Sequence, residues 1–166
     1  MSKFKAIREI IGKTIVRVYL VVWPPFGEDR FSQVDLSFGF KFDLEENGIT
    51  VISTSLQDIW TPTIRIEYPS SVFESKLFYN RMPKWMKSEM EAGFSYEFYD
   101  VTDWEVFDKI LNHKINKLEW ICVGDIKEPL GVRLCFDDDF VLSFPNADGN
   151  TVQTSRFNLS GNLRAF

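Results

Sequence analysis

Residues 102–123, TDWEVFDKILNHKINKLEWICV, decide the fold that we expect for this chain. Thr102 and Glu105 have the spacing of a capping box, in which a hydroxyl and a carboxyl satisfy free N–H groups at the start of a helix. The apolar residues that then share one helical face are Val106, Phe107, Ile110 and Leu111. Asn112 favours the left-handed conformation that ends a helix, and residues 114–123 have the composition of a strand. The stretch therefore predicts a capped helix that leads into a strand.

Residues 2–23, SKFKAIREIIGKTIVRVYLVVW, repeat this pattern one hundred positions earlier. Ser2 stands where Thr102 stands, as an N-cap, and Gly12 stands where Asn112 stands, as the residue that ends the helix. We therefore expect two halves of similar structure.

The polar faces of the two predicted helices differ in charge. Lys3, Lys5 and Arg8 are followed, at the equivalent positions of the second helix, by Asp103, Glu105 and Asp108. If the two helices pack side by side, these charges attract and set the orientation of the helices. Each exposed pair contributes only about 0–1 kcal/mol, so burial still dominates stability.

The remaining chain shows strand and turn patterns. Residues 32–44 alternate between apolar and polar side chains, which is typical of a half-buried antiparallel strand. Asn47 and Gly48 predict a type I′ turn to the next strand. Further strands are predicted at 49–53, 63–68, 132–136, 140–144 and 151–157.

An aromatic-rich segment, 70–101, separates the two predicted halves. Pro83 suits the first turn of a helix, and Met82, Met86 and Met90 then share one face of it. The sequence therefore predicts a single α+β domain, 1–166. Its antiparallel β-sheets come from two similar α-β-β-β halves, 1–69 and 102–157, with an aromatic, partly helical insertion at 70–101.

The composition is that of a soluble globular protein, with 45% hydrophobic and 26% charged residues. No apolar run approaches the roughly 20 residues that a membrane span needs, and the N-terminus lacks the apolar core of a signal peptide. We therefore expect a cytoplasmic protein with no membrane partner. Cys122 and Cys135 lie in apolar strand-like runs and are expected to be buried free thiols.

The net charge of −5 lies entirely in the second part of the chain. Residues 1–92 contain 12 acidic and 12 basic residues, whereas residues 93–166 contain 12 acidic and 7 basic residues. This acidity disfavours a nucleic-acid partner and favours a basic protein partner. The candidate partner-binding residues are Glu97, Asp100, Asp103, Asp108, Asp137, Asp138 and Asp139.

No pattern predicts a catalytic, metal or cofactor site. His113 is the one histidine, and no nucleophile, zinc-ligand or phosphate-loop motif accompanies it. Asp137, Asp138 and Asp139 are adjacent on an extended chain, so their side chains point to opposite sides. We interpret them as a solvated hairpin turn and expect no cofactor, no metal and no enzymatic activity.

Two segments resemble the bacterial immunity proteins of polymorphic and contact-dependent toxin systems. They are IIGKTIVRV, Ile10 to Val18, and LCFDDDFVL, Leu134 to Leu142, in a small, acidic, aromatic-rich chain. The resemblance is one of general pattern and carries no contact residue with it. It implies a protein that binds a cognate toxin domain, often a basic nuclease, and blocks it.

Three functions remain open from the sequence. The first is an immunity or inhibitor protein that neutralises a basic toxin domain by binding. The second is a non-catalytic scaffold or a homo-oligomeric assembly module, such as a homodimer formed through an aromatic face. The third is an enzyme of unrecognised type that uses carboxylates.

Overall fold

The computed structural model describes residues 4–23, 35–44, 47–56, 60–85, 96–146 and 149–159. In chain order its elements are α1 (Lys5–Arg8), β1 (Ile15–Trp23), β2 (Asp35–Phe42), β3 (Ile49–Leu56), β4 (Trp60–Glu67), β5 (Phe73–Glu74), α2 (Leu77–Trp85), β6 (Glu97–Asp100), η2 (Glu105–Phe107), β7 (Lys117–Ile121), β8 (Gly131–Cys135), β9 (Phe140–Asn146) and β10 (Gly149–Gln153). Strands account for 50% of the structure and helices for 11%. The predicted α+β class is therefore confirmed, with sheet as the dominant part.

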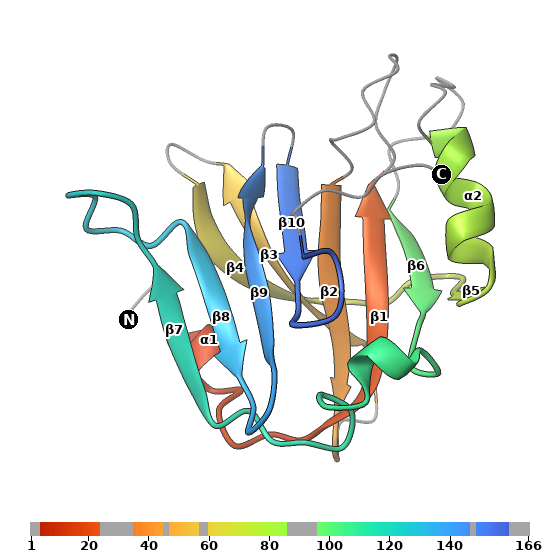
Figure 1. The fold of residues 1–166 in the computed structure, drawn as a ribbon, viewed down its shortest axis with the longest axis horizontal. Coiled ribbons are helices and arrows are strands. Elements are labelled where there is room, and N and C mark those ends of the chain that lie inside the picture. The colour runs from red at the N-terminus through yellow and green to blue at the C-terminus, as the bar shows by residue number, and fades with distance from the viewer. Residues whose placement is uncertain are drawn as a thin grey trace.

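The strands form two sheets (Figure 1). One has six strands in the order β4-β3-β2-β1-β6-β5, and the other has four in the order β10-β9-β8-β7. All described pairs are antiparallel except β5–β6, which is parallel. Each predicted half thus contributes four strands that pair with their neighbours in sequence, and these correspond to the four strand segments predicted in each half. The segment 70–101 adds β5, α2 and β6.

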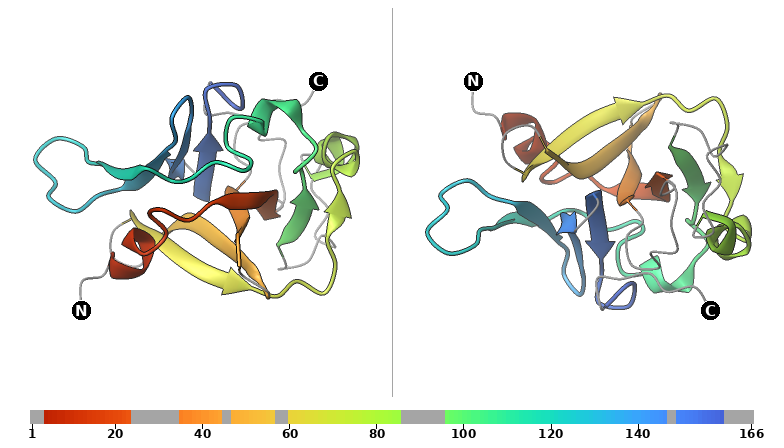
Figure 2. Two further views of the ribbon diagram at one scale, coloured as in Figure 1. Left: turned by 90° about the horizontal axis from the view of Figure 1, so that it is seen from below. Right: turned by 90° about the horizontal axis from the view of Figure 1, so that it is seen from above.

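The main core lies where the four-stranded sheet packs against the six-stranded sheet (Figure 2). β9 and β10 lie against β2 and β3, and β8 lies against β4. The alternation predicted for 32–44 holds over β2, where the residues that face this core are Leu36, Phe38, Phe40 and Phe42, each no more than 1% exposed. Beyond the strand the pattern ends, because Leu44 is 94% exposed; Val34 lies outside the described residues.

The six-stranded sheet is curled. β4 and β5 are its two opposite edges, yet only residues 68–72 join them, crossing behind the sheet (Figures 1 and 2). A flat sheet of six strands would hold its edges about 24 Å apart, whereas this connection spans at most about 20 Å. The curl gives the second face a small core of its own, made of Tyr19, Val21, Ile49, Val51 and Phe98. Gly39 lies among them because a Cβ there would come within 2.7 Å of the Ile49 side chain.

The two segments that precede β1 and β7 pair with each other. Four backbone hydrogen bonds run from Gly12 N–H to Ile115 O (2.8 Å), from Asn112 N–H to Ile15 O (2.7 Å), from Ile15 N–H to His113 O (3.1 Å) and from Ile115 N–H to Lys13 O (3.1 Å). Each bond has a counterpart displaced by one hundred positions. Gly12 and Asn112 both adopt the predicted left-handed conformation, with φ of 85° and 62°.

A buried amide joins the sheets at the other end. The β2–β3 ladder pairs residues 38–40 with 50–52, and the same register, continued by two residues, would set Leu36 opposite Thr54. Instead, the side chain of Asn150, from β10, lies between them. Its Oδ1 accepts the Thr54 N–H at 3.0 Å, its Nδ2 donates to Leu36 O at 2.8 Å, and the residue is 1% exposed. Asn150 thus replaces one rung of a ladder to which it does not belong.

The capped helix predicted at Thr102 is wrong. Residues 105–107 form a single 3-10 turn whose N-cap is Trp104, with no side-chain cap. The Thr102 hydroxyl accepts the Val18 N–H at 3.1 Å and donates to Asp100 at 2.6 Å, so it extends the β1–β6 pairing. The hydroxyl forms two hydrogen bonds in this position beside the long strand β1, whereas a helix cap would only satisfy the start of one short turn. In the first half, Ser2 lies outside the described residues and the N-cap of α1 is Phe4.

Two further local predictions concern α2 and the turn after β2. The helix expected to open at Pro83 begins six residues earlier, at Leu77, because Phe78 and Met82 of its first turns are buried in the core. Among the described residues of the turn after β2, positive φ angles occur at Leu44, which the sequence did not indicate, and at Gly48. Met86, Met90, Glu45 and Glu46 lie outside the described residues.

We expect Asn150→Ala to lower the free energy of unfolding by about 3–5 kcal/mol, because it leaves at least two buried backbone groups without a partner. Urea denaturation of the purified protein measures this change. Asn116→Ala is the matched control, since that exposed amide makes one surface hydrogen bond, to Asp137. A cost for Asn150→Ala as small as that of the control would contradict the role of Asn150.

Asp35 lies at the same junction. Its carboxyl packs against Gly149 and accepts the Asn150 N–H at 3.4 Å, and burial raises its pKa to about 6, although that hydrogen bond and Arg65 oppose the rise. The folded state therefore holds this proton more strongly than the unfolded chain, whose carboxyl titrates near pH 4. Stability due to Asp35 is complete below about pH 4 and is lost as the pH rises through about 6.

We expect Asp35→Asn to remove this part of the pH dependence. Relative to the natural protein, the variant should gain up to about 3 kcal/mol in free energy of unfolding between pH 4 and pH 7. Chemical denaturation of both proteins at a series of pH values measures the difference. A difference that stays constant with pH would show that Asp35 ionises normally.

Candidate partner-binding surface

The first two predicted site residues, Glu97 and Asp100, are neutralised within the chain. Both lie on β6, with side chains 16% and 21% exposed. Glu97 accepts hydrogen bonds from Arg81 and from the Tyr99 hydroxyl. Asp100 forms an ion pair with Arg17. Both carboxylates therefore already have a cationic partner within the chain.

The environment of Asp100 keeps it ionised. Burial opposes ionisation, but hydrogen bonds from Arg17 and from the hydroxyl and N–H of Thr102 outweigh it. They hold the pKa of the Asp100 carboxyl below its usual range. The carboxylate therefore ties the end of β6 to the neighbouring strand β1 through Arg17.

The three adjacent aspartates occupy the turn between β8 and β9 and have different roles. Asp137 and Asp138 are exposed, and Asp137 accepts a hydrogen bond from Asn116 at 2.7 Å. Asp139 is only 7% exposed, and its Oδ1 accepts the Phe140 N–H at 2.7 Å and the Ser155 N–H at 2.9 Å. Asp139 therefore holds the turn to the chain after β10, and the prediction that it is a solvated surface residue is wrong.

A depression of about 430 Å³ borders this turn. It is lined by all three aspartates together with Lys117, Glu119 and Arg133. Glu119 already accepts hydrogen bonds from Lys117 at 2.7 Å and from Arg133 at 3.4 Å. Among the described residues, no group of three or more His, Cys, Asp or Glu side chains is placed to hold a metal ion.

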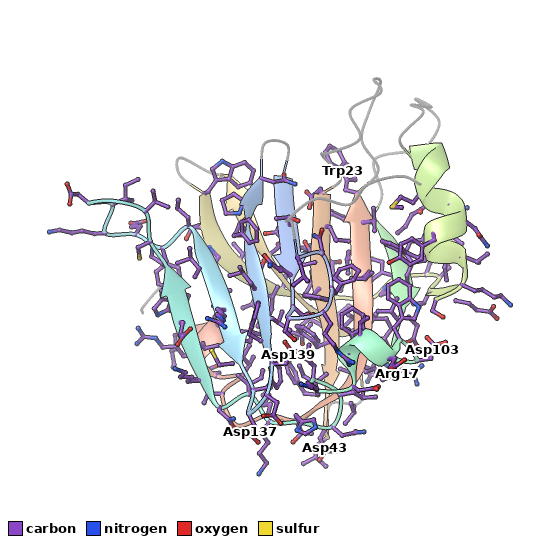
Figure 3. All side chains as sticks on the ribbon, viewed as in Figure 1. Arg17, Trp23, Asp43, Asp103, Asp137 and Asp139 are labelled. Carbon is purple, nitrogen blue, oxygen red and sulfur yellow. The ribbon has the colours of Figure 1, made fainter. Side chains whose placement is uncertain are left out.

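The last two predicted residues, Asp103 and Asp108, are exposed and flank η2. Asp103 accepts a hydrogen bond from the Ser75 hydroxyl at 2.9 Å. It lines an open cleft of about 540 Å³ between β1, β6 and the start of α2, together with Arg17, Glu74, Ser75, Lys76, Asp100 and Thr102. Figure 3 shows Asp103 beside Arg17 and away from Asp137 and Asp139, so the predicted residues form two separate groups.

An aromatic stack next to Asp103 was not predicted. The rings of Tyr79 and Trp104 are parallel to within 9° at 5.3 Å, and those of Trp104 and Phe107 are parallel to within 9° at 6.0 Å. Phe107 is fully buried, Trp104 is half-buried and Tyr79 is 45% exposed. The stack therefore connects the core to the surface through α2 and η2. No sequence pattern reveals it, because it depends on how α2 docks.

We call this region the acidic–aromatic surface and define it by Tyr79, Asp103, Trp104, Glu105 and Asp108. Its three carboxylates are exposed. Arg156 lies beside it and donates to the backbone oxygen of Glu105 rather than to a carboxylate. The two predicted helices do not pack side by side: α1 lies behind β7 and β8, and η2 lies in front of β1 (Figures 1 and 2). The acidity of residues 103–108 therefore faces outward.

The cysteines are both free thiols. Cys135 is buried, as predicted, but Cys122 is exposed because it follows the last residue of β7. Within the described ranges, none of the helices has the length and apolar character needed to cross a bilayer. Comparisons with protein-family models, curated proteins and solved structures found no match to this chain.

We expect Asp139→Ala to lower the free energy of unfolding by about 2–4 kcal/mol, because the carboxylate accepts two backbone hydrogen bonds. Asp138→Ala, at the neighbouring exposed position, should change it by no more than about 0.5 kcal/mol. Thermal or urea denaturation of the two variants tests this difference. Equal effects would mean that the turn is held by its backbone alone.

Proposed function

We propose that this chain is an immunity or inhibitor protein that binds and neutralises a cognate bacterial toxin domain of basic character, such as a nuclease, in the cytoplasm. It acts by stoichiometric binding and not by catalysis. The observation that carries the proposal is the acidic–aromatic surface, where exposed carboxylates lie in the same segment as Trp104, whose ring stacks on the half-exposed Tyr79 and on the buried Phe107.

The two components of this surface have separate physical roles. Asp103, Glu105 and Asp108 attract a basic partner and raise its rate of association. Tyr79 supplies a large apolar contact at a small entropic cost, because Trp104 already holds its ring. Burial raises the pKa of the Tyr79 phenol, so its hydroxyl stays neutral and able to donate a hydrogen bond. Steering charges around one anchor are typical of tight inhibitory interfaces.

We also propose that the chain is a single domain built from a structural repeat, with halves 1–69 and 102–157 and the insertion 70–101. Three observations support the repeat. The backbone hydrogen bonds between the halves are reciprocal at a spacing of one hundred. Gly12 and Asn112 share the left-handed conformation, and each half continues into strands that pair in chain order.

The main alternative is a non-catalytic scaffold or homo-oligomeric assembly module. One observation favours self-association: over the described part of the chain, β7 pairs with β8 alone and forms an edge of its sheet. The two functions are compatible, because β7 and the acidic–aromatic surface lie on opposite sides of the molecule (Figure 1).

Co-expression in a cell that produces the toxin domain encoded next to this chain's own gene tests the proposed function. The natural chain should restore growth and form a complex with the toxin domain. Reversing Asp103 and Asp108 to lysine should lower the association rate constant about tenfold or more and weaken its dependence on salt. Reversing Asp43 and Asp125, which are exposed elsewhere, changes the net charge equally and is the matched control.

A second pair of variants tests the anchor. Tyr79→Ala should weaken the complex about 30-fold, mainly through faster dissociation. Tyr68→Ala removes a tyrosine that is 70% exposed on the β4–β5 connection and should have no effect. Rate constants for association and dissociation that are unchanged in both the Asp103/Asp108 variant and Tyr79→Ala would overturn the proposed surface. Absence of any toxin that the natural chain neutralises would overturn the function.

A further inference from the structure

β1 and β7 occupy corresponding places in the two sheets but have different surroundings. Both strands follow the reciprocal hydrogen bonds between residues 12–15 and 112–115, and both pair with the next strand in the chain. β1 is also bordered on its other side by β6, which pairs with it antiparallel. Over the described part of the chain, β7 pairs with β8 alone and forms the outer edge of its sheet (Figure 1).

The other sheet edges are protected. β4 contains Pro62, which removes one donor from its edge. β5 has only two residues, and β10 lies against β2 through Gly149 and Asn150. β7 contains no proline and keeps a regular ladder over residues 117–121. Such an edge presents N–H and C=O groups that can template another strand.

The charges on β7 are arranged so that two antiparallel copies of the strand place opposite charges side by side. Lys117 and Glu119 lie on the outer face of the sheet and flank Leu118. In an antiparallel pair with Leu118 on a twofold axis, Lys117 faces Glu119 of a second copy, and the same contact recurs on the other side of the axis. Directly opposed side chains are about 5 Å apart at Cβ, closer than the roughly 6.6 Å between alternate residues of one strand. Lys117 and Glu119 of one copy can therefore form ion pairs with Glu119 and Lys117 of the second copy.

We propose that a second copy of this chain pairs antiparallel with β7, edge to edge, and forms a symmetric homodimer with a continuous eight-stranded sheet. The twofold operation closes the assembly, because each copy has one such edge and uses it once. Few residues pair in each copy, so the association is weak and depends on protein concentration. The inference is independent of the proposed toxin partner.

Sedimentation equilibrium of the full chain over a wide concentration range tests the dimer. The mass of the natural protein should rise from 19.4 kDa toward twice that value. Glu119→Lys makes the edge wholly basic, and Lys117→Glu makes it wholly acidic, so each variant alone should remain monomeric. An equimolar mixture of the two should associate about tenfold more tightly than either variant alone, because every opposed pair is then attractive.

Asp43→Lys and Lys109→Glu are the matched controls, since both residues are exposed and lie outside β7. Each should dimerise like the natural protein, and their mixture should show no gain. Far-UV circular dichroism verifies that all variants are folded. The inference is overturned if the natural protein is monomeric at every concentration, if Glu119→Lys and Lys117→Glu both dimerise normally, or if their mixture associates no better than each alone.

Discussion

The relative position of the two sheets depends on the buried amide of Asn150. β2 and β3 separate beyond their short ladder, and the amide satisfies the Leu36 carbonyl and the Thr54 N–H that the separation leaves. In a low-dielectric interior, an unpaired backbone group is costly, so the separation of these strands and the docking of β10 must occur together. Gly149 precedes the amide because a Cβ at that position would lie 2.7 Å from the Asp35 carboxyl. The close approach of Gly149 to Asp35 and the insertion of the Asn150 amide between β2 and β3 thus occur at the same junction.

Much of the fold could be predicted because its signals are local. Alternation identifies the core face of β2, and the left-handed preference of Gly12 and Asn112 places both chain reversals. The prediction fails where a side chain has a distant alternative partner. Thr102 has the spacing of a helix cap, but its hydroxyl bonds to the backbone of Val18, which is 84 positions away. The split of β2 from β3 is equally hidden, since Asn150 is more than 90 positions from either strand end.

The candidate site could be predicted only in part, because charge is visible in a sequence and ion pairing is not. Asp100 and Asp103 are three positions apart, yet one is paired with Arg17 and the other is exposed. Asp138 and Asp139 are adjacent, yet the second is buried and holds a turn. Asp138 and Asp139 lie in the turn between β8 and β9, where Asp139 Oδ1 accepts the Phe140 and Ser155 N–H groups and Asp138 stays exposed, so the two carboxylates enter different environments. The acidity of residues 93–166 therefore could not separate carboxylates that are paired or buried within the fold from carboxylates that are exposed.

The acidic–aromatic surface and the β7 edge are separate in space. β7 lies at one side of the molecule, whereas α2 and η2 lie at the other (Figures 1 and 2). A dimer joined at β7 leaves both copies of the acidic–aromatic surface uncovered, and the twofold axis relates them. Such a dimer would present two equivalent copies of the proposed binding surface. Simultaneous engagement of a partner with two sites gains affinity from effective concentration without any new contact. Weak self-association would thus be enough to raise the affinity for a two-site partner. Once the first copy of the surface is bound, binding of the second depends on its local concentration and not on the bulk concentration of protein.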